Sequence, residues 1–264
     1  MTTATLFSVI ATIQSPASAA TLIPVDLELS LLVDVSPSVS AQEYDLQIGG
    51  YRDAFINLAP LFDSDEFGTV AINFIQWAGS TKQEESIPWM LVEDGNSALE
   101  LANAIDEVVR PFGFAGTAPG SAIQFATELF STNAYDGNYW IIDVSGDGFQ
   151  NSGISTSTAR DAALASGVTA INGLPILPAT FNSSLDDWYE ANIQGGEGSF
   201  VIAAEGFENF GQAVEQKLNL ELALSASDSP PGSSLAPQAI PETSSVLGLA
   251  IVGSMLASFR YRNS

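Results

Sequence analysis

The stretch LELSLLVDVSPSVS, residues 27–40, turns from an apolar run into a loop with several oxygen-bearing side chains. The run ends on Asp34, and Ser36 and Ser38 follow at intervals of two. A short Leu- and Val-rich run of this kind is typical of a buried β-strand. The following SAQE, residues 40–43, is a capping-box sequence that predicts the start of a helix. The Asp and the two Ser residues are therefore expected in a loop between a strand and a helix.

The region from residue 26 to residue 224 repeats this change between two periodicities. Short runs rich in Val and Ile are expected to be strands: ELSLLVDV (28–35), TVAINFIQW (69–77), SIPWMLV (86–92), YWIIDVS (139–145), VTAINGLPIL (168–177) and SFVIAA (199–204). Apolar residues at helical spacing lie between most of them: Tyr44, Ile48, Tyr51, Phe55 and Leu58; Leu99, Ala102, Ile105 and Val109; Ile123, Ala126 and Phe130; and Phe207, Phe210, Val214 and Leu218.

This alternation predicts one α/β domain with a doubly wound, mostly parallel sheet covered by helices on both faces. The run at 86–92 follows the run at 69–77 after only a polar loop, so we expect a hairpin and one antiparallel strand. In doubly wound sheets, ligands bind beyond the carboxyl ends of the strands. Asp34 and the serines after it are thus expected at the ligand-binding edge.

The composition restricts the chemistry available to such a site. The chain of 264 residues has no His and no Cys, and 31 Asp and Glu against 7 Lys and Arg give a net charge of -24. These counts leave no Ser-His or Cys-His nucleophile pair and no zinc site of the usual nitrogen and sulfur type. We expect no nucleic-acid partner, because cations are needed to neutralise phosphates. A glycosidase that uses two carboxylates stays open.

Two further loops at the expected edge carry oxygen ligands. The loop and helix start at 111–123 contain Thr117, and the strand at 139–145 is followed by Asp147 and Gly148. Together with the first loop they supply two carboxylates and three hydroxyls, a set of hard oxygen ligands suited to Mg²⁺, Mn²⁺ or Ca²⁺. Two carboxylates balance the charge of a divalent cation. If they act through water, the metal stays electrophilic, and an open coordination position on it would attract an acidic group from another molecule.

The same five side chains resemble the metal-ion-dependent adhesion site of von Willebrand factor type A domains: Asp34, Ser36, Ser38, Thr117 and Asp147. The resemblance covers about residues 26–224, and the stretches at 25–51 and 141–153 resemble a bacterial group of such domains with no assigned function. It implies that the hydroxyls bind a metal directly, that the aspartates act mostly through water, and that the open position takes an acidic residue of a partner. Mg²⁺ is the expected ion, with Mn²⁺ or Ca²⁺ as alternatives.

Asp143 lies within the apolar strand at 139–145 and needs a partner, because a buried carboxylate must be satisfied. We expect a hydrogen bond from a neighbouring loop in preference to a role in metal binding.

Both ends of the chain carry features of exported proteins. The apolar N-terminus before Ala17-Ser18-Ala19 fits a secretory signal peptide. IPET at 240–243, the apolar segment at 246–259 and the terminal RYRNS resemble the Pro-Glu-Pro sorting tail of bacterial exopolysaccharide-associated proteins, which an exosortase processes; the second proline is absent. We expect four parts: a signal peptide (1–19), a von Willebrand A-like domain (20–224), a Pro/Ser-rich linker (225–243) and a hydrophobic sorting or anchor segment (244–264).

These features favour a non-enzymatic, exported module displayed at the cell surface or in the extracellular matrix, and tethered to the membrane before any processing of its tail. It would use its cation to bind an acidic protein or polysaccharide. Two alternatives stay open: a structural matrix protein whose metal braces the loops, and a carboxylate glycosidase that acts on surface polysaccharide.

Overall fold

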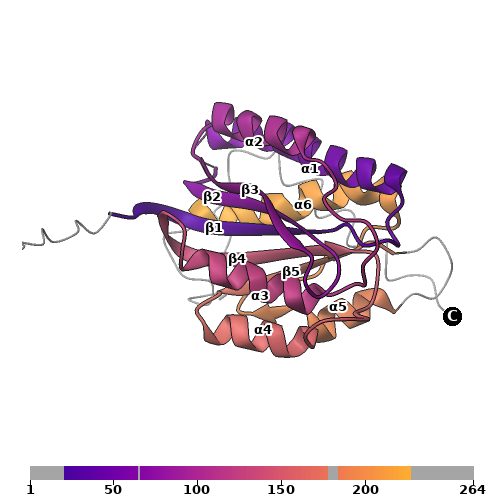
Figure 1. Cartoon of the computed structure of the whole chain (residues 1–264). Helices are drawn as coiled ribbons and strands as arrows, with labels where there is room; N and C mark the ends of the chain where they lie inside the picture. The colour runs from indigo at the N-terminus through magenta and orange to yellow at the C-terminus, as the bar shows by residue number, and fades with distance from the viewer. Residues whose placement is uncertain (1–20, 65, 178–183, 227–264) are drawn as a thin grey trace, which may run out of the picture. The chain divides into compact units, whose positions relative to one another are not determined.

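The computed structural model describes residues 21–64, 66–177 and 184–226 (Figure 1). The expected signal peptide and sorting segment lie outside these residues, as does all but the start of the expected linker. Those parts of the sequence analysis therefore stay predictions. Among the described residues, no helix is both long enough and apolar enough to span a membrane.

A six-stranded sheet runs through the centre of the described residues (Figure 1). Its strands are β1 (Ile23–Asp34), β2 (Val70–Trp77), β3 (Gln83–Val92), β4 (Tyr135–Gly146), β5 (Ala170–Pro175) and β6 (Gly195–Gly196). They lie in the order β3-β2-β1-β4-β5-β6. The four inner strands pair in parallel, whereas β3 and the two-residue β6 are antiparallel to their neighbours. The predicted mostly parallel α/β sheet and the antiparallel hairpin are confirmed.

Helices cover both faces of the sheet (Figure 1). The helices are α1 (Ala41–Phe62), α2 (Gly95–Glu107), α3 (Pro119–Phe130), α4 (Thr156–Ala165), α5 (Leu185–Asn192) and α6 (Phe210–Leu222), with short 3₁₀ helices at Phe207–Asn209 and Ala223–Ala226. Helices α1, α2 and α6 lie on one face, and α3, α4 and α5 lie on the other. The sheet is therefore the middle of three layers.

β1 buries apolar residues on both faces of the sheet, although its second face also carries the buried polar residues Glu28, Ser30 and Asp34. Leu29, Leu31 and Val33 pack into the core under α1, α2 and α6, whereas Leu32 points into the core on the opposite face. Burial of each such apolar side chain contributes about 2 kcal/mol. Asp34 ends the strand at the sheet edge where the ligand loops begin.

Helix α1 begins where its capping box predicts. The Ser40 hydroxyl accepts a hydrogen bond from the Glu43 amide at 3.2 Å, and the Glu43 carboxylate accepts one from the Ser40 amide at 2.8 Å. The predicted stripe of five apolar residues on this helix is buried. The helix start thus fixes the end of the loop that carries Ser36 and Ser38.

The predicted apolar stripe of α2 is wrong at both ends. Leu99 is 40% exposed and Val109 is 76% exposed. The helix ends at Glu107, which leaves Val109 outside it. Its buried side is displaced by one residue at the start and includes Ala98 and Leu101 in place of Leu99. The small Ala98 hid this face from a pattern based on large apolar residues.

The predicted strand at 199–204 is reduced to two isolated bridges beside β5, formed by Val201 and Ala204. The Gly173 amide still donates to this segment, at the Phe200 carbonyl 3.1 Å away. The next position of β5 that would donate is Pro175, which has no N–H, so the ladder is interrupted. Helices α4 and α5 were not predicted, because they bury mainly small or isolated apolar side chains.

Asp143 on β4 finds its partner on a helix, and the predicted hydrogen bond from a loop is wrong. The Lys217 ammonium on α6 lies 2.7 Å from Asp143 Oδ1, and both side chains are fully buried. Lys217 also pairs with Glu221 one helical turn later, and Asn172 on β5 donates to the same Glu221 oxygen at 2.7 Å. A buried ionic cluster therefore links α6 to the centre of the sheet.

Candidate metal centre

The five predicted site residues meet at the carboxyl edge of the parallel strands. Asp34 is the last residue of β1, and Ser36 and Ser38 occupy the loop that leads into α1. Thr117 precedes α3 by two residues, and Asp147 directly follows β4. Parallel β1 and β4 are neighbours, which brings loops more than a hundred residues apart in sequence into contact.

A chain of polar contacts joins these residues. The Ser36 amide donates to Asp34 Oδ1 at 2.7 Å, and the hydroxyls of Ser36 and Ser38 are 3.0 Å apart. The Ser38 hydroxyl donates to Asp147 Oδ1 at 2.7 Å, and the Thr117 hydroxyl lies 3.4 Å from that of Ser36. The structure thus brings all five predicted side chains together, while their role as metal ligands stays a prediction.

The two carboxylates lie in an environment that disfavours their negative charge. Asp34 is fully buried, and its Oδ2 has no hydrogen-bond partner among the described residues. Burial, and after it the negative charge of Asp147, raise the pKa of Asp34 to about 7. Burial also raises the pKa of Asp147, against the hydrogen bond from Ser38. A cation between them would relieve both effects, because it favours the ionised carboxylates.

The chemistry of the donors fits a hard divalent cation. The cluster offers carboxylate and hydroxyl oxygens, the ligand type that suits Mg²⁺, Mn²⁺ and Ca²⁺. Within the described part of the chain, no three His, Cys, Asp or Glu side chains are grouped so that they could hold a metal. The candidate centre therefore depends on its hydroxyls as well as its two carboxylates. Ser38 is exposed and Asp147 is partly exposed, so the cluster opens to solvent on that side.

Arg110 binds the main chain of the first loop, the one that carries Ser36 and Ser38, and was not identified as a site residue from the sequence. Its Nη2 donates to the carbonyls of Val35 at 2.8 Å and Ser36 at 2.7 Å. The guanidinium also lies 5.7 Å from the centre of the Tyr44 ring. A basic residue directly before the predicted ligand loop at 111–123, in a chain with so few cations, was the available signal.

Asn151 holds the second loop in a similar way. Its side-chain Oδ1 accepts a hydrogen bond from the main-chain N–H of Thr117 at 2.8 Å, and its main-chain N–H donates to the Thr117 carbonyl at 3.0 Å. Its Nδ2 lies 3.4 Å from the Thr117 hydroxyl. Asn151 comes four residues after Asp147 in the same loop, so one loop supplies a carboxylate and positions a hydroxyl.

Gly146 leaves the space that Asp34 and Tyr189 occupy. A Cβ atom at this position would lie 2.8 Å from both Asp34 Oδ2 and the Tyr189 hydroxyl. Tyr189 on α5 is fully buried, and its hydroxyl has no hydrogen-bond partner among the described residues. Two unpartnered polar atoms therefore lie near the same point, at the inner side of the candidate centre.

The described residues have the fold of von Willebrand factor type A domains. The von Willebrand factor type A structure from Catenulispora acidiphila matches with a TM-score of 0.52 and 12% identity, covering 75% of this chain and 43% of that one. Proximal thread matrix protein 1 from the mussel byssus, solved with a zinc-occupied MIDAS motif, gives 0.53 and 17%, covering 77% and 49%. The pilus adhesin SpaC from Lactobacillus rhamnosus GG, in its open conformation, gives 0.51 and 12%, covering 75% and 30%.

This chain spans less than half the length of each of those three proteins. It belongs to the family described as "Protein of unknown function (DUF1194)", whose profile matches residues 24–226. A comparison with curated proteins gives no match.

Proposed function

We propose that this protein is a non-enzymatic binding module that holds a divalent cation at the candidate metal centre and uses it to bind an acidic group of a partner. The proposed ligands are the five residues that meet at the sheet edge: Asp34, Ser36, Ser38, Thr117 and Asp147. One observation carries the proposal: the Asp34 carboxylate, which lies with a second carboxylate and three hydroxyls, is fully buried, and its Oδ2 has no hydrogen-bond partner among the described residues.

The five proposed ligands differ in charge and in exposure to solvent. Asp34 and Asp147 supply the negative charge, whereas the three hydroxyls add oxygen ligands without adding charge. When bound, a divalent cation would offer an electrophilic position to an acidic ligand. The exposed Ser38 and the partly exposed Asp147 mark the side from which that ligand approaches.

We propose Mg²⁺ as the resident ion, with Mn²⁺ and Ca²⁺ as alternatives. Oxygen-only donors favour these ions over softer ones. The zinc in the mussel protein supports a divalent cation in general at this type of site.

We further propose that the protein is exported and displayed at the cell surface or in the extracellular matrix. The apolar N-terminus and the C-terminal sorting-like tail support export. Two proteins of similar structure, a thread matrix protein and a pilus adhesin, fit this location. Exosortase processing of the tail belongs to the same proposal.

A structural matrix role with a bracing metal is the second candidate. Arg110 and Asn151 already tie the ligand loops together through main-chain contacts, which favours a rigid site. In that case metal would stabilise the fold without any partner binding.

Thermal unfolding of the full-length protein in EDTA, Mg²⁺, Mn²⁺ and Ca²⁺ tests the metal centre. An ion that binds only the folded state, at a hundred times its dissociation constant, stabilises by about 2.7 kcal/mol. We expect this stabilisation in the wild type and its loss in Asp34→Asn and Ser36→Ala.

Ser30→Ala is the matched control, because Ser30 is a buried serine on β1, away from the site, whose hydroxyl has no hydrogen-bond partner among the described residues. It should keep the response to metal. A wild type that unfolds at the same temperature in all four solutions would refute the proposed function. Turnover of a polysaccharide by the metal-loaded protein would replace it with the glycosidase alternative.

A further inference from the structure

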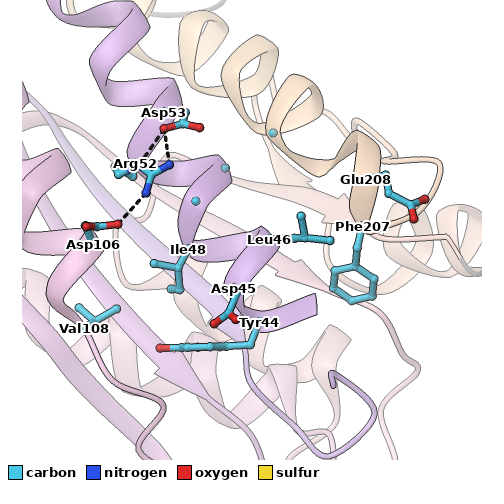
Figure 2. A pocket seen from close by; sticks show the side chains of 13 residues that line it. Tyr44, Asp45, Leu46, Ile48, Arg52, Asp53, Asp106, Val108, Phe207 and Glu208 are labelled. Atoms are coloured by element: carbon cyan, nitrogen blue, oxygen red, sulfur yellow. Dashed lines mark hydrogen bonds and ion pairs between the residues drawn. The ribbon is translucent and has the colours of Figure 1, made fainter. Parts of the chain in front are cut away.

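A groove runs from the candidate metal centre along helix α1. A hollow of about 400 Å³ begins at Asp147 and lies between the start of α1, the end of β5 and the segment before α6. A second hollow of about 530 Å³ continues along α1 (Figure 2). Both are lined by Leu46, Phe207 and Glu208, so the two hollows adjoin at these three residues. We call the two adjoining hollows together the α1 groove.

The walls of the α1 groove are strongly acidic. Its carboxylates come from α1, α2, the β4 loop and the segment before α6: Glu43, Asp45, Asp53, Asp106, Asp147 and Glu208. Arg52 is the one basic residue in its lining, and it pairs at 2.7 Å with Asp53 and with Asp106 (Figure 2). The stretch next to the metal centre, with Glu43 and Glu208, therefore has no cation of its own among the lining residues.

The floor of the same groove is partly apolar. Leu46 is 38% exposed on α1, and Phe207 is half-buried in the short 3₁₀ helix that precedes α6 (Figure 2). Ile176 and Leu177 extend the apolar lining beyond the end of β5. An occupant that matches this lining needs positive charge to pair with the acidic walls and apolar groups to pack on the floor.

Resting on the proposed function, we infer that the α1 groove receives an extended protein segment that carries acidic, apolar and basic side chains together. The acidic side chain reaches the cation at Asp147, apolar side chains pack on Leu46 and Phe207, and a Lys or Arg pairs with Glu208. A uniformly anionic polysaccharide supplies only the first of these contacts. Of the two partner classes in the proposed function, the groove therefore selects protein.

Selection from a phage-displayed library of random twelve-residue peptides on the full-length protein in Mg²⁺, with release by EDTA, tests this inference. The released peptides should carry Asp or Glu together with Lys or Arg. Synthetic copies are then measured by fluorescence anisotropy against the wild type, Ser36→Ala and Glu208→Lys. We expect loss of binding with Ser36→Ala and about tenfold weaker binding with Glu208→Lys, with an affinity that falls as NaCl rises.

Glu100→Lys is the charge-matched control. Glu100 is exposed on α2. This helix begins shortly after Val92 of β3, which pairs with Val70, the first residue of β2. The helix therefore begins at the edge of the sheet opposite the metal centre. The Glu100→Lys variant should leave peptide affinity unchanged. Glu208 is not a proposed ligand, so Glu208→Lys should also keep the wild-type stabilisation by Mg²⁺.

Other outcomes would overturn the inference while leaving the metal centre intact. These are a failure to enrich peptides, equal affinity for peptides without basic residues, and binding of alginate that tightens in Glu208→Lys. The last result would mean that an anionic polysaccharide, and not a protein segment, occupies the α1 groove. A wild type that Mg²⁺ does not stabilise would instead be a failure of the proposed function itself.

Discussion

Arg110 Nη2 donates to the main-chain carbonyl of Ser36 at 2.7 Å, although 74 positions separate the two residues. The same atom reaches the carbonyl of Val35 at 2.8 Å. The Arg110 guanidinium therefore fixes two consecutive carbonyls at the start of the loop, and Ser36, which carries one of them, is a proposed metal ligand. The guanidinium also contributes positive charge near Asp34.

We predict that Arg110→Gln lowers metal affinity by about tenfold, because groups that orient metal ligands typically carry effects of 10–100-fold. Titration of the unfolding temperature with Mg²⁺ measures this. Arg160→Gln is a matched control, since Arg160 also donates to two main-chain carbonyls, those of Ala191 at 2.8 Å and Gln194 at 3.3 Å, away from the site. Equal loss of metal affinity in both variants would contradict a positioning role for Arg110.

Gly146 and Gly148 offer a second matched pair. A Cβ at Gly146 would lie 2.8 Å from Asp34 Oδ2, whereas one at Gly148 would meet nothing closer than 3.9 Å. We predict that Gly146→Ala displaces Asp34 and removes most of the stabilisation by Mg²⁺, while Gly148→Ala keeps it. Calorimetric titration with Mg²⁺ compares the two. A Gly146→Ala variant with wild-type affinity would show that Asp34 does not need its observed position.

The sequence was sufficient to predict the five residues of the candidate centre as neighbours, for a simple geometric reason. Asp34 ends one parallel strand and Asp147 directly follows another, and the carboxyl ends of such strands share one edge. Ser40 and Glu43 also form a local capping motif that can be read within four residues. Local patterns and the rule for parallel sheets thus determined this part of the structure.

What the sequence did not predict depends on contacts between distant segments. Lys217 reaches Asp143 from a helix 74 positions away, and no periodicity records that pairing. The segment at 199–204 has the composition of a strand, but its neighbour Pro175 cannot donate to it. Arg110 likewise acts through main-chain carbonyls, which carry no signature in the sequence.

Lys217 should contribute strongly to the stability of the fold even though it lies away from the metal centre. It is fully buried against Asp143 and Glu221, so Lys217→Met leaves buried carboxylates without their cation. Breaking a buried pair in this way typically costs about 3–5 kcal/mol. Urea unfolding measures the loss, and Lys82→Met, at the chain's other lysine, is the control because Lys82 is exposed. Similar stabilities for the two variants would argue against the buried cluster.

Glu221 should make stability depend on pH. Burial, and after it the negative charge of Asp143, raise its pKa from 4.5 to about 7. Between these values the folded state keeps a proton that the unfolded state loses, so stability falls as pH rises through this window and levels off above it. Glu221→Gln keeps an oxygen for Lys217 and Asn172 but cannot titrate. Urea unfolding from pH 4 to 8 should show the variant gaining on the wild type by on the order of 2 kcal/mol across the window. Parallel curves for the two proteins would mean that Glu221 has no raised pKa in the folded state.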